Sequence, residues 1–156
     1  MTREVVVVSG VRTAIGTFGG SLKDIAPTEL GAQIVRESLA LANVDGKDVG
    51  HVVFGHVVNT EPKHMYLSRV AALNGGCGEG TPAYNVNRLC GSGLQAIVNA
   101  SQSILLVDTH IAIDGAAENM SRAPFASLNM RWTTDTDRHF NHMWLSIAPK
   151  KRLQSA

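Results

Sequence analysis

Hydrophobic and polar positions along this chain predict strands and helices in regular succession. Residues 5–8, four valines, predict a strand buried on both faces, and residues 51–58 predict a second strand. Between them, apolar residues recur at helical spacing from Pro27, which the first turn of a helix tolerates, to Ala42. Further helices are expected over 65–73 and 94–106, and further strands over 83–87 and 110–113. This succession predicts an α/β fold with a mainly parallel sheet and alternating helices.

The expected helix over 94–106 differs from the others because the segment 90–107 contains no charged side chain. Large apolar residues lie on one side of this helix. Small residues form a second side, namely Gly93, Ala96, Ala100 and Ser103. A helix that covers one surface of a sheet normally turns charged residues to water. We therefore expect this helix to be fully buried between two layers, of which this chain supplies one.

The composition narrows the class of protein. A chain of 156 residues fits one domain or half of a larger one. Charged residues make up 17%, against roughly 25% in an average domain, which favours unusually complete burial, an oligomer, or both. The net charge of +1 gives no electrostatic reason to expect nucleic acid or a membrane as partner.

No apolar run approaches the ~20 residues of a membrane span, and two cysteines make a poor disulfide framework, so we expect a soluble, cytoplasmic protein.

The segment 87–93, Asn-Arg-Leu-Cys-Gly-Ser-Gly, joins an expected strand to the uncharged helix. It places Cys90 at a helix N-terminus, where unpaired N–H groups and the helix dipole favour an anion. Thiolates are the reactive form of cysteine, and such surroundings stabilise them. Gly91 and Gly93 leave room for a substrate carbonyl beside N–H donors, as in the strand-turn-helix elbow of hydrolases. On these residues alone, a nucleophilic Cys90 and an inert buried cysteine both remain open.

Other titratable residues support weaker hypotheses. A metal site is conceivable at four residues near the C-terminal end, but a solvated polar segment is the preferred interpretation of Asp135, Asp137, His139 and His142. Packing or surface roles are expected for His51, His56, His64 and His110. Cys77 is expected to be a loop thiol that takes no part in the reaction. Neither a G-x-G-x-x-G sequence nor a P-loop is present, which argues against a dinucleotide site.

Four ordered segments make the chain resemble the thiolases, a family of acetyl-CoA acetyltransferases and 3-ketoacyl-CoA thiolases. Residues 87–96 resemble the acyl-enzyme motif of that family, and residues 8–16 resemble its N-terminal signature. Residues 53–55 with 65–76 are similar to its second strand and helix, and residues 115–121 to its Gly-Glu-Ser-Met-Ser turn. The sequences of these segments resemble those of bacterial biosynthetic β-ketothiolases in particular. The resemblance implies a thiolase-like N-terminal half over 1–126, followed by an unmatched tail, loop or disordered, over 127–156.

The resemblance also implies acyl transfer through Cys90. This cysteine would take an acyl group from acyl-CoA as a thioester, and its backbone N–H, with the turn at Gly91, would form an oxyanion hole. A second acetyl-CoA would accept that group in a Claisen condensation, and the reverse reaction would cleave 3-ketoacyl-CoA in fatty acid metabolism. Coenzyme A enters as part of the substrate, and no metal or other cofactor is implied. Family members are dimers or tetramers, so a homo-oligomer is expected, with the strand before Cys90 pairing across the interface.

The chain departs from the family as well. Three motifs that supply an activating histidine and a second cysteine do not occur in it, namely Asn-Glu-Ala-Phe, Gly-His-Pro and Cys-x-Gly-Gly-Gly. Asn119 stands where the family usually has serine, and Arg12 and Glu118 are expected to have structural roles near the site. Two alternatives to an active enzyme follow: a truncated, catalytically incompetent subunit that only oligomerises, or a defective gene product. The third alternative is a ketoacyl-synthase-like condensing enzyme. The sequence of residues 87–96 argues against it.

Overall fold

A three-stranded parallel sheet lies at the centre of the computed structural model, which describes residues 3–125. Its strands are β1 (His51–Gly55), β2 (Ala83–Val86) and β3 (Ala112–Ala116), in the order β2-β1-β3. β1 is the central strand, so Val53 lies opposite Tyr84 of β2 on one side and Asp114 of β3 on the other. The predicted α/β class with parallel strands is confirmed.

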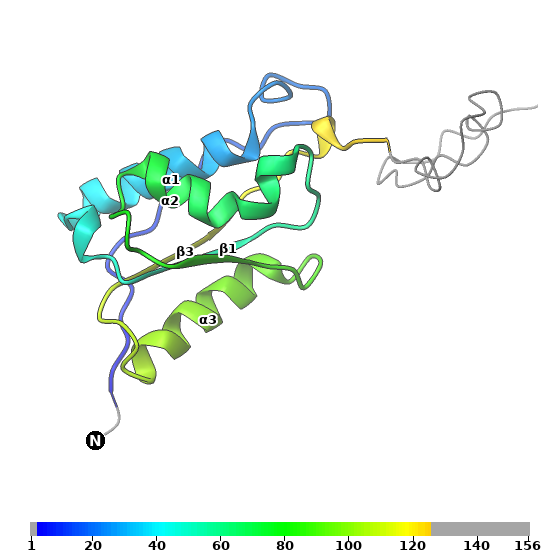
Figure 1. The fold of residues 1–156 in the computed structure, drawn as a ribbon. Helices are drawn as coiled ribbons and strands as arrows, with labels where there is room; N and C mark the ends of the chain where they lie inside the picture. The colour runs from blue at the N-terminus through cyan, green and yellow to red at the C-terminus, as the bar shows by residue number, and fades with distance from the viewer. Residues whose placement is uncertain (1–2, 126–156) are drawn as a thin grey trace, which may run out of the picture.

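Helices cover both faces of this sheet. α1 (Pro27–Ala42) and α2 (Leu67–Gly75) pack together on one face, and α3 (Ser92–Leu105) lies on the other (Figure 1). Three short 3₁₀ helices complete the order of elements, at Gly46–Asp48, Pro62–Tyr66 and Met120–Arg122. The described chain is therefore a three-layer α/β/α unit in which the carboxyl ends of all strands meet at one edge.

The two interfaces of the sheet differ in the size of their side chains. On the α1–α2 side, the fully buried Phe54 of β1 lies in a cluster with large aliphatic residues such as Val35 and Leu67. On the α3 side, the buried cluster consists of Val53 and the two alanines Ala96 and Ala100, with the partly buried Val86 and Ala112 packed against it. Small side chains allow α3 to lie close to the strands, and this closeness brings the start of α3 against the backbone of the sheet.

The prediction that the uncharged helix is fully buried is wrong for this chain. The small side of α3 faces the sheet, so the large side is exposed: Leu94 is 67% exposed, Ile97 43% and Leu105 49%. The physical reason is that nothing in the described residues forms a second layer over α3. Within a single chain, an apolar helix face is buried only where another element of that chain packs on it.

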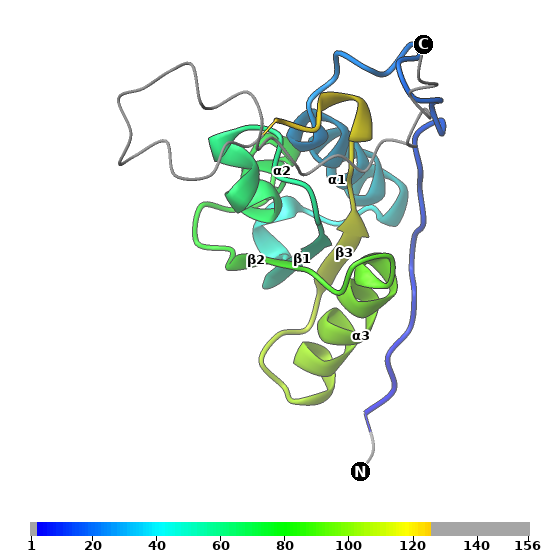
Figure 2. The same cartoon turned by 90° about the vertical axis from the view of Figure 1, so that its right-hand side faces the viewer.

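The predicted first strand is also wrong. Residues 5–8 form no strand within the described chain, and Val7 is 85% exposed. Two side-chain hydrogen bonds hold the segment extended along the β3 side of the molecule (Figure 2): Arg3 donates to the carbonyl oxygen of Ile104 at 2.9 Å, and Ser9 to that of Ser38 at 3.1 Å. A β-branched run becomes a strand only beside another strand, and none of the described strands pairs with it.

The remaining boundaries follow from local hydrogen bonding. The helix predicted over 27–42 has those bounds. β1 stops at Gly55 instead of residue 58. The N–H of His56 still donates to the carbonyl oxygen of Val86 in β2, whereas those of Val57 and Val58 donate to a carboxylate. α2 ends at Gly75, and the next residue, Gly76, is its C-cap. The φ of 104° at Gly76 is one that glycine adopts without strain. No helix in residues 3–125 is long and apolar enough to cross a membrane. The predicted boundary at 126 lies outside the described residues.

Gly75 provides a test of the contact between α1 and α2. A Cβ atom there would lie 2.5 Å from Cβ of Val35 and 3.1 Å from the carbonyl oxygen of Ala32. We expect Gly75→Ala to lower the free energy of unfolding by about 1–3 kcal/mol because it overpacks this interface. Gly80→Ala is the matched control, since open space surrounds Gly80, and its effect should stay within about 0.5 kcal/mol. Urea unfolding measures both, and equal effects would contradict the packing.

Candidate active site

The sequence-predicted nucleophile lies on the surface at the carboxyl edge of the sheet. Cys90 is an exposed free thiol in the turn that leads from β2 to α3. Gly91 is the N-cap residue of α3, and the helix proper starts at Ser92. The structure thus places Cys90 directly before a helix N-terminus, as the spacing predicts, and leaves its sulfur accessible to a ligand.

The turn that carries Cys90 is tight. The N–H of Gly91 donates to the carbonyl oxygen of Arg88 at 3.1 Å, and the N–H of Ser92 donates to that of Leu89 at 3.0 Å. Leu89 has a φ of 51°, in the left-handed region that side chains other than glycine and asparagine rarely adopt. The chain therefore reverses direction at the residue before the thiol.

Backbone N–H groups beside the thiol have no partner in the described part of the chain. The N–H groups of Cys90 and Gly93 donate none of the hydrogen bonds found among the described residues. N–H groups at a helix start point away from the helix and carry its positive partial charge. Chemically, an exposed thiol beside such donors can attack a carbonyl carbon while the donors stabilise the oxygen as it gains charge.

Two close contacts fix the start of α3 against the sheet. A Cβ atom at Gly55, the last residue of β1, would lie 2.6 Å from the carbonyl carbon of Ser92 and 2.8 Å from the nitrogen of Gly93. A Cβ atom at Gly93 would lie 3.3 Å from Cβ of Ala116, the last residue of β3. Because at most the methyl group of Ala116 separates these backbones, the ends of β1 and β3 directly position the turn that carries Cys90.

Glu118 connects the chain segments that follow β1 and β3. Its carboxylate accepts the N–H of Val57 at 2.9 Å and the N–H of Val58 at 3.2 Å. The residue follows β3, and the two valines follow β1, so one side chain bridges two loops at the carboxyl edge. The expected structural role of Glu118 agrees with these contacts. Arg12, in contrast, is exposed and donates only to the carbonyl oxygen of its neighbour Thr13, at 3.4 Å.

A pair of buried histidines was missed by the sequence analysis. The rings of His56 and His64 are perpendicular, with centroids 6.0 Å apart, and both residues are almost fully buried. Nδ1 of His56 donates to the carbonyl oxygen of Ala117 at 2.8 Å, and Nδ1 of His64 lies 2.7 Å from the hydroxyl of Thr60. Nε2 of each ring has no partner among the described residues. Eight positions separate the two histidines, so no sequence pattern indicated that they meet.

Charged groups surround His64 on one side. Glu61 has Oε2 at 3.9 Å from Nε2 of His64, and the same carboxylate is paired with Lys63 and Arg122. These pairs lower the pKa of Glu61, mainly through the hydrogen bond from Lys63. Burial favours the uncharged form of the neighbouring ring. Removal from water disfavours the imidazolium cation and so lowers the pKa of His64.

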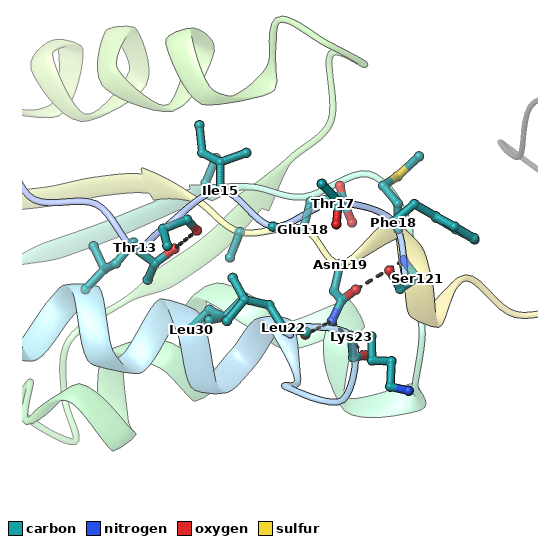
Figure 3. A pocket seen from close by; sticks show the side chains of 16 residues that line it. Thr13, Ile15, Thr17, Phe18, Leu22, Lys23, Leu30, Glu118, Asn119 and Ser121 are labelled. Atoms are coloured by element: carbon teal, nitrogen blue, oxygen red, sulfur yellow. Dashed lines mark hydrogen bonds between the residues drawn. The ribbon is translucent and has the colours of Figure 1, made fainter. Parts of the chain in front are cut away.

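An open hollow of about 550 Å³ lies beside the residues that follow β3 (Figure 3). Its walls come from residues 13–18, from Leu30 and Ile34 of α1, and from residues 116–121. Several polar side chains there are already hydrogen-bonded within the chain. Asn119 donates to three carbonyl oxygens, those of Leu22, Lys23 and Ile25, at 2.8–3.1 Å. A serine hydroxyl, with one hydrogen, could not make these contacts, which gives this departure from the thiolase sequence a structural reason.

The other candidate residues are separate from this edge. Cys77 belongs to the hydrophobic core between the sheet and the α1–α2 layer, and burial raises the pKa of its thiol. Within residues 3–125, no three side chains of His, Cys, Asp or Glu come together as a metal site. The alternative metal site at Asp135, Asp137, His139 and His142 lies outside the described residues.

Comparison with known proteins gives consistent matches. The thiolase N-terminal domain family matches residues 5–148. The chain is 71% identical, over 132 residues, to the beta-ketothiolase BktB of Cupriavidus necator, covering 85% of this chain and 34% of that protein. Its fold matches the crystal structure of the Bacillus anthracis acetyl-CoA acetyltransferase with a TM-score of 0.81 and 34% identity, again covering 85% and 34%.

A second solved structure contains a ligand. The human mitochondrial 3-ketoacyl-CoA thiolase in complex with CoA matches with a TM-score of 0.74 and 36% identity, over 78% of this chain and 31% of that one. The present chain therefore spans about a third of the length of the relatives that it matches.

The burial of His64 predicts how the free energy of unfolding depends on pH. Its pKa is lowered in the folded state, so near and below pH ~6.5 the unfolded chain binds a proton that the folded chain resists. We expect the free energy of unfolding to decrease between pH 7.5 and pH 5.5, measured by urea unfolding, and His64→Gln to reduce that decrease. His110→Gln, at an exposed histidine, is the control and should leave it unchanged. An equal decrease in the wild type and in His64→Gln would contradict the assignment.

Proposed function

The chain belongs to the thiolase family, and from that premise we propose that its Cys90 accepts an acyl group from acyl-CoA as a covalent thioester. The observation that carries this proposal is the exposed thiol of Cys90 beside the N–H groups of Cys90 and Gly93, which have no partner within residues 3–125. The same segment, 87–96, resembles the acyl-enzyme motif of the family. The names of the relatives, which include acetyl-CoA acetyltransferases and 3-ketoacyl-CoA thiolases, support acyl-CoA as the substrate class.

The proposed half-reaction is balanced without any further reactant. The sulfur of Cys90 attacks the carbonyl carbon of the thioester, and the carbonyl oxygen becomes an oxyanion that accepts the free N–H groups. The bond between that carbon and the sulfur of CoA then breaks as the intermediate collapses. The proton of Cys90 goes to the departing thiolate, so the products are acyl-Cys90 and free CoA.

The second half-reaction requires more than this site offers. An acetyl-CoA that is to accept the acyl group must lose a proton from its methyl carbon, and no general base lies near Cys90 in the motifs that the chain shares with thiolases. We propose that the full condensation, or the reverse cleavage in fatty acid metabolism, takes place where the rest of the thiolase machinery joins this unit. The unpaired state of both cysteines, Cys77 and Cys90, supports a reducing, cytoplasmic setting for it.

One experiment tests the first step. The protein is incubated with acetyl-CoA, and Cys90 is examined by intact mass and peptide mapping while released CoA is measured. We expect one acetyl group on Cys90 and an equal amount of CoA, and no acetyl group in Cys90→Ala. Cys77→Ala is the matched control and should be acetylated like the wild type, because Cys77 is buried in the core. A wild-type protein that neither gains an acetyl group nor releases CoA would refute the proposal.

A second candidate function is that of an oligomerising subunit, and the exposed face of α3 supports it. Leu94, Ile97 and Leu105 form a contiguous apolar side on a helix without charged residues, and such patches are typical of protein interfaces. The strand β2 adds an open sheet edge next to it. We propose that a second copy of this chain covers this surface.

Sedimentation velocity tests this oligomer. We expect a dimer or larger species for the wild type, and a monomer for the double variant Leu94→Glu, Ile97→Glu, because two buried charges would cost several kcal/mol at such an interface. Leu41→Glu is the control, since Leu41 is equally exposed on α1 at the opposite face. If the double variant keeps the mass of the wild type, α3 is not the interface.

A further inference from the structure

Ser92 is the buried side chain of the turn that carries Cys90. The serine is only 4% exposed, whereas every residue of 87–90 is exposed. Its hydroxyl accepts the N–H of Arg88 at 2.8 Å and donates to the carbonyl oxygen of Leu89 at 2.6 Å. Both bonds reach back past Cys90, so the hydroxyl closes a loop of backbone around the thiol.

This loop holds Leu89 in an unfavourable conformation. The left-handed φ of 51° is unfavourable for a residue with a side chain and persists only where other contacts impose it. Two side-chain hydrogen bonds add to the backbone bond from the N–H of Ser92: the hydroxyl of Ser92 donates to the carbonyl oxygen of Leu89, and Oδ1 of Asn87 accepts the N–H of Leu89 at 3.0 Å. Leu89 itself is 70% exposed, so packing does not hold it in place.

The conformation of Leu89 determines where Cys90 and its N–H point. The start of α3 is fixed by the ends of β1 and β3, through Gly55 and Ala116. The remaining freedom of the site is rotation about the backbone of residues 87–91. An oxyanion donor works only when it lies about 2.7–3.1 Å from the oxygen that becomes charged, so a small rotation there removes the benefit.

We propose that Ser92 is a positioning residue for acyl transfer at Cys90. Its hydroxyl, supported by the side chain of Asn87, holds Leu89 left-handed and so aims the N–H of Cys90 at the position of the oxyanion. The biological meaning of this role rests on the proposed function. The positioning itself is a property of the turn and is open to a test that does not require binding of CoA.

The test compares two reactions of the same sulfur. Acetylation by p-nitrophenyl acetate passes through an oxyanion, whereas alkylation by iodoacetamide displaces iodide from carbon and forms none. Peptide mapping follows both rates at Cys90 in one buffer, and their ratio cancels changes in exposure or ionisation of the thiol. We expect Ser92→Ala to lower the ratio by about tenfold, part of the roughly 10²–10³ that one oxyanion donor is worth.

Matched variants separate positioning from stability. Ser92→Thr keeps the hydroxyl and should restore most of the ratio. Ser101→Ala removes a serine hydroxyl that donates to the carbonyl oxygen of Ile97 on the same helix, and should leave the ratio unchanged. Should Ser92→Ala fail to fold, Asn87→Ala, at an exposed residue that makes the other contact to Leu89, takes its place with the same expected decrease.

The outcomes are distinct from those of the acetyl-CoA experiment. A ratio in Ser92→Ala equal to that of the wild type overturns the positioning role, as does an equal ratio in Asn87→Ala when it is the variant measured. A wild-type protein that reacts with p-nitrophenyl acetate and not with acetyl-CoA overturns the proposed function and leaves the role of Ser92 to be judged by the ratio alone.

Discussion

The close approach of two backbones is the contact on which the rest of this structure depends. Gly55 ends β1 where α3 begins, and a Cβ atom there would lie 2.6 Å from the carbonyl carbon of Ser92. Only a strand that ends in glycine allows a helix to start so near the sheet. The small residues of α3, Ala96 and Ala100, extend the same close packing along the helix. The position of Cys90 follows, because its turn is the short connection between a fixed strand and a fixed helix.

Polar side chains and a backbone contact both hold the carboxyl edge of the sheet. Glu118 accepts the N–H groups of Val57 and Val58, and Nδ1 of His56 donates to the carbonyl oxygen of Ala117. Beside the start of α3, the N–H groups of Cys90 and Gly93 have no partner within residues 3–125. The same edge therefore combines backbone groups that are already hydrogen-bonded with donors that can bind a ligand.

Local signals in the sequence predicted local structure, and long-range contacts escaped them. The 3.6-residue period of 27–42 and the glycines around Cys90 identified α1 and the turn, since both are decided within a few residues. The strand predicted at the valines 5–8 does not form, because a strand must pair with another strand. The local pattern of apolar residues does not reveal whether such a partner is present. The orientation of α3 was missed because large and small apolar sides are equally compatible with burial. His56 and His64 meet only through the path of the loop after β1, which no spacing reveals.

The small-residue side of α3 also limits how this unit can diverge. Ala96 is fully buried against Val53, with no flexible side chain between helix and strand to absorb added volume. A larger residue at Ala96 would push α3 as a rigid body away from the strands. The turn that carries Cys90 would move with the helix, because it leads directly into its first residue. Substitutions on the outer side of the helix carry no such penalty, so mutational tolerance should change abruptly from one side of α3 to the other.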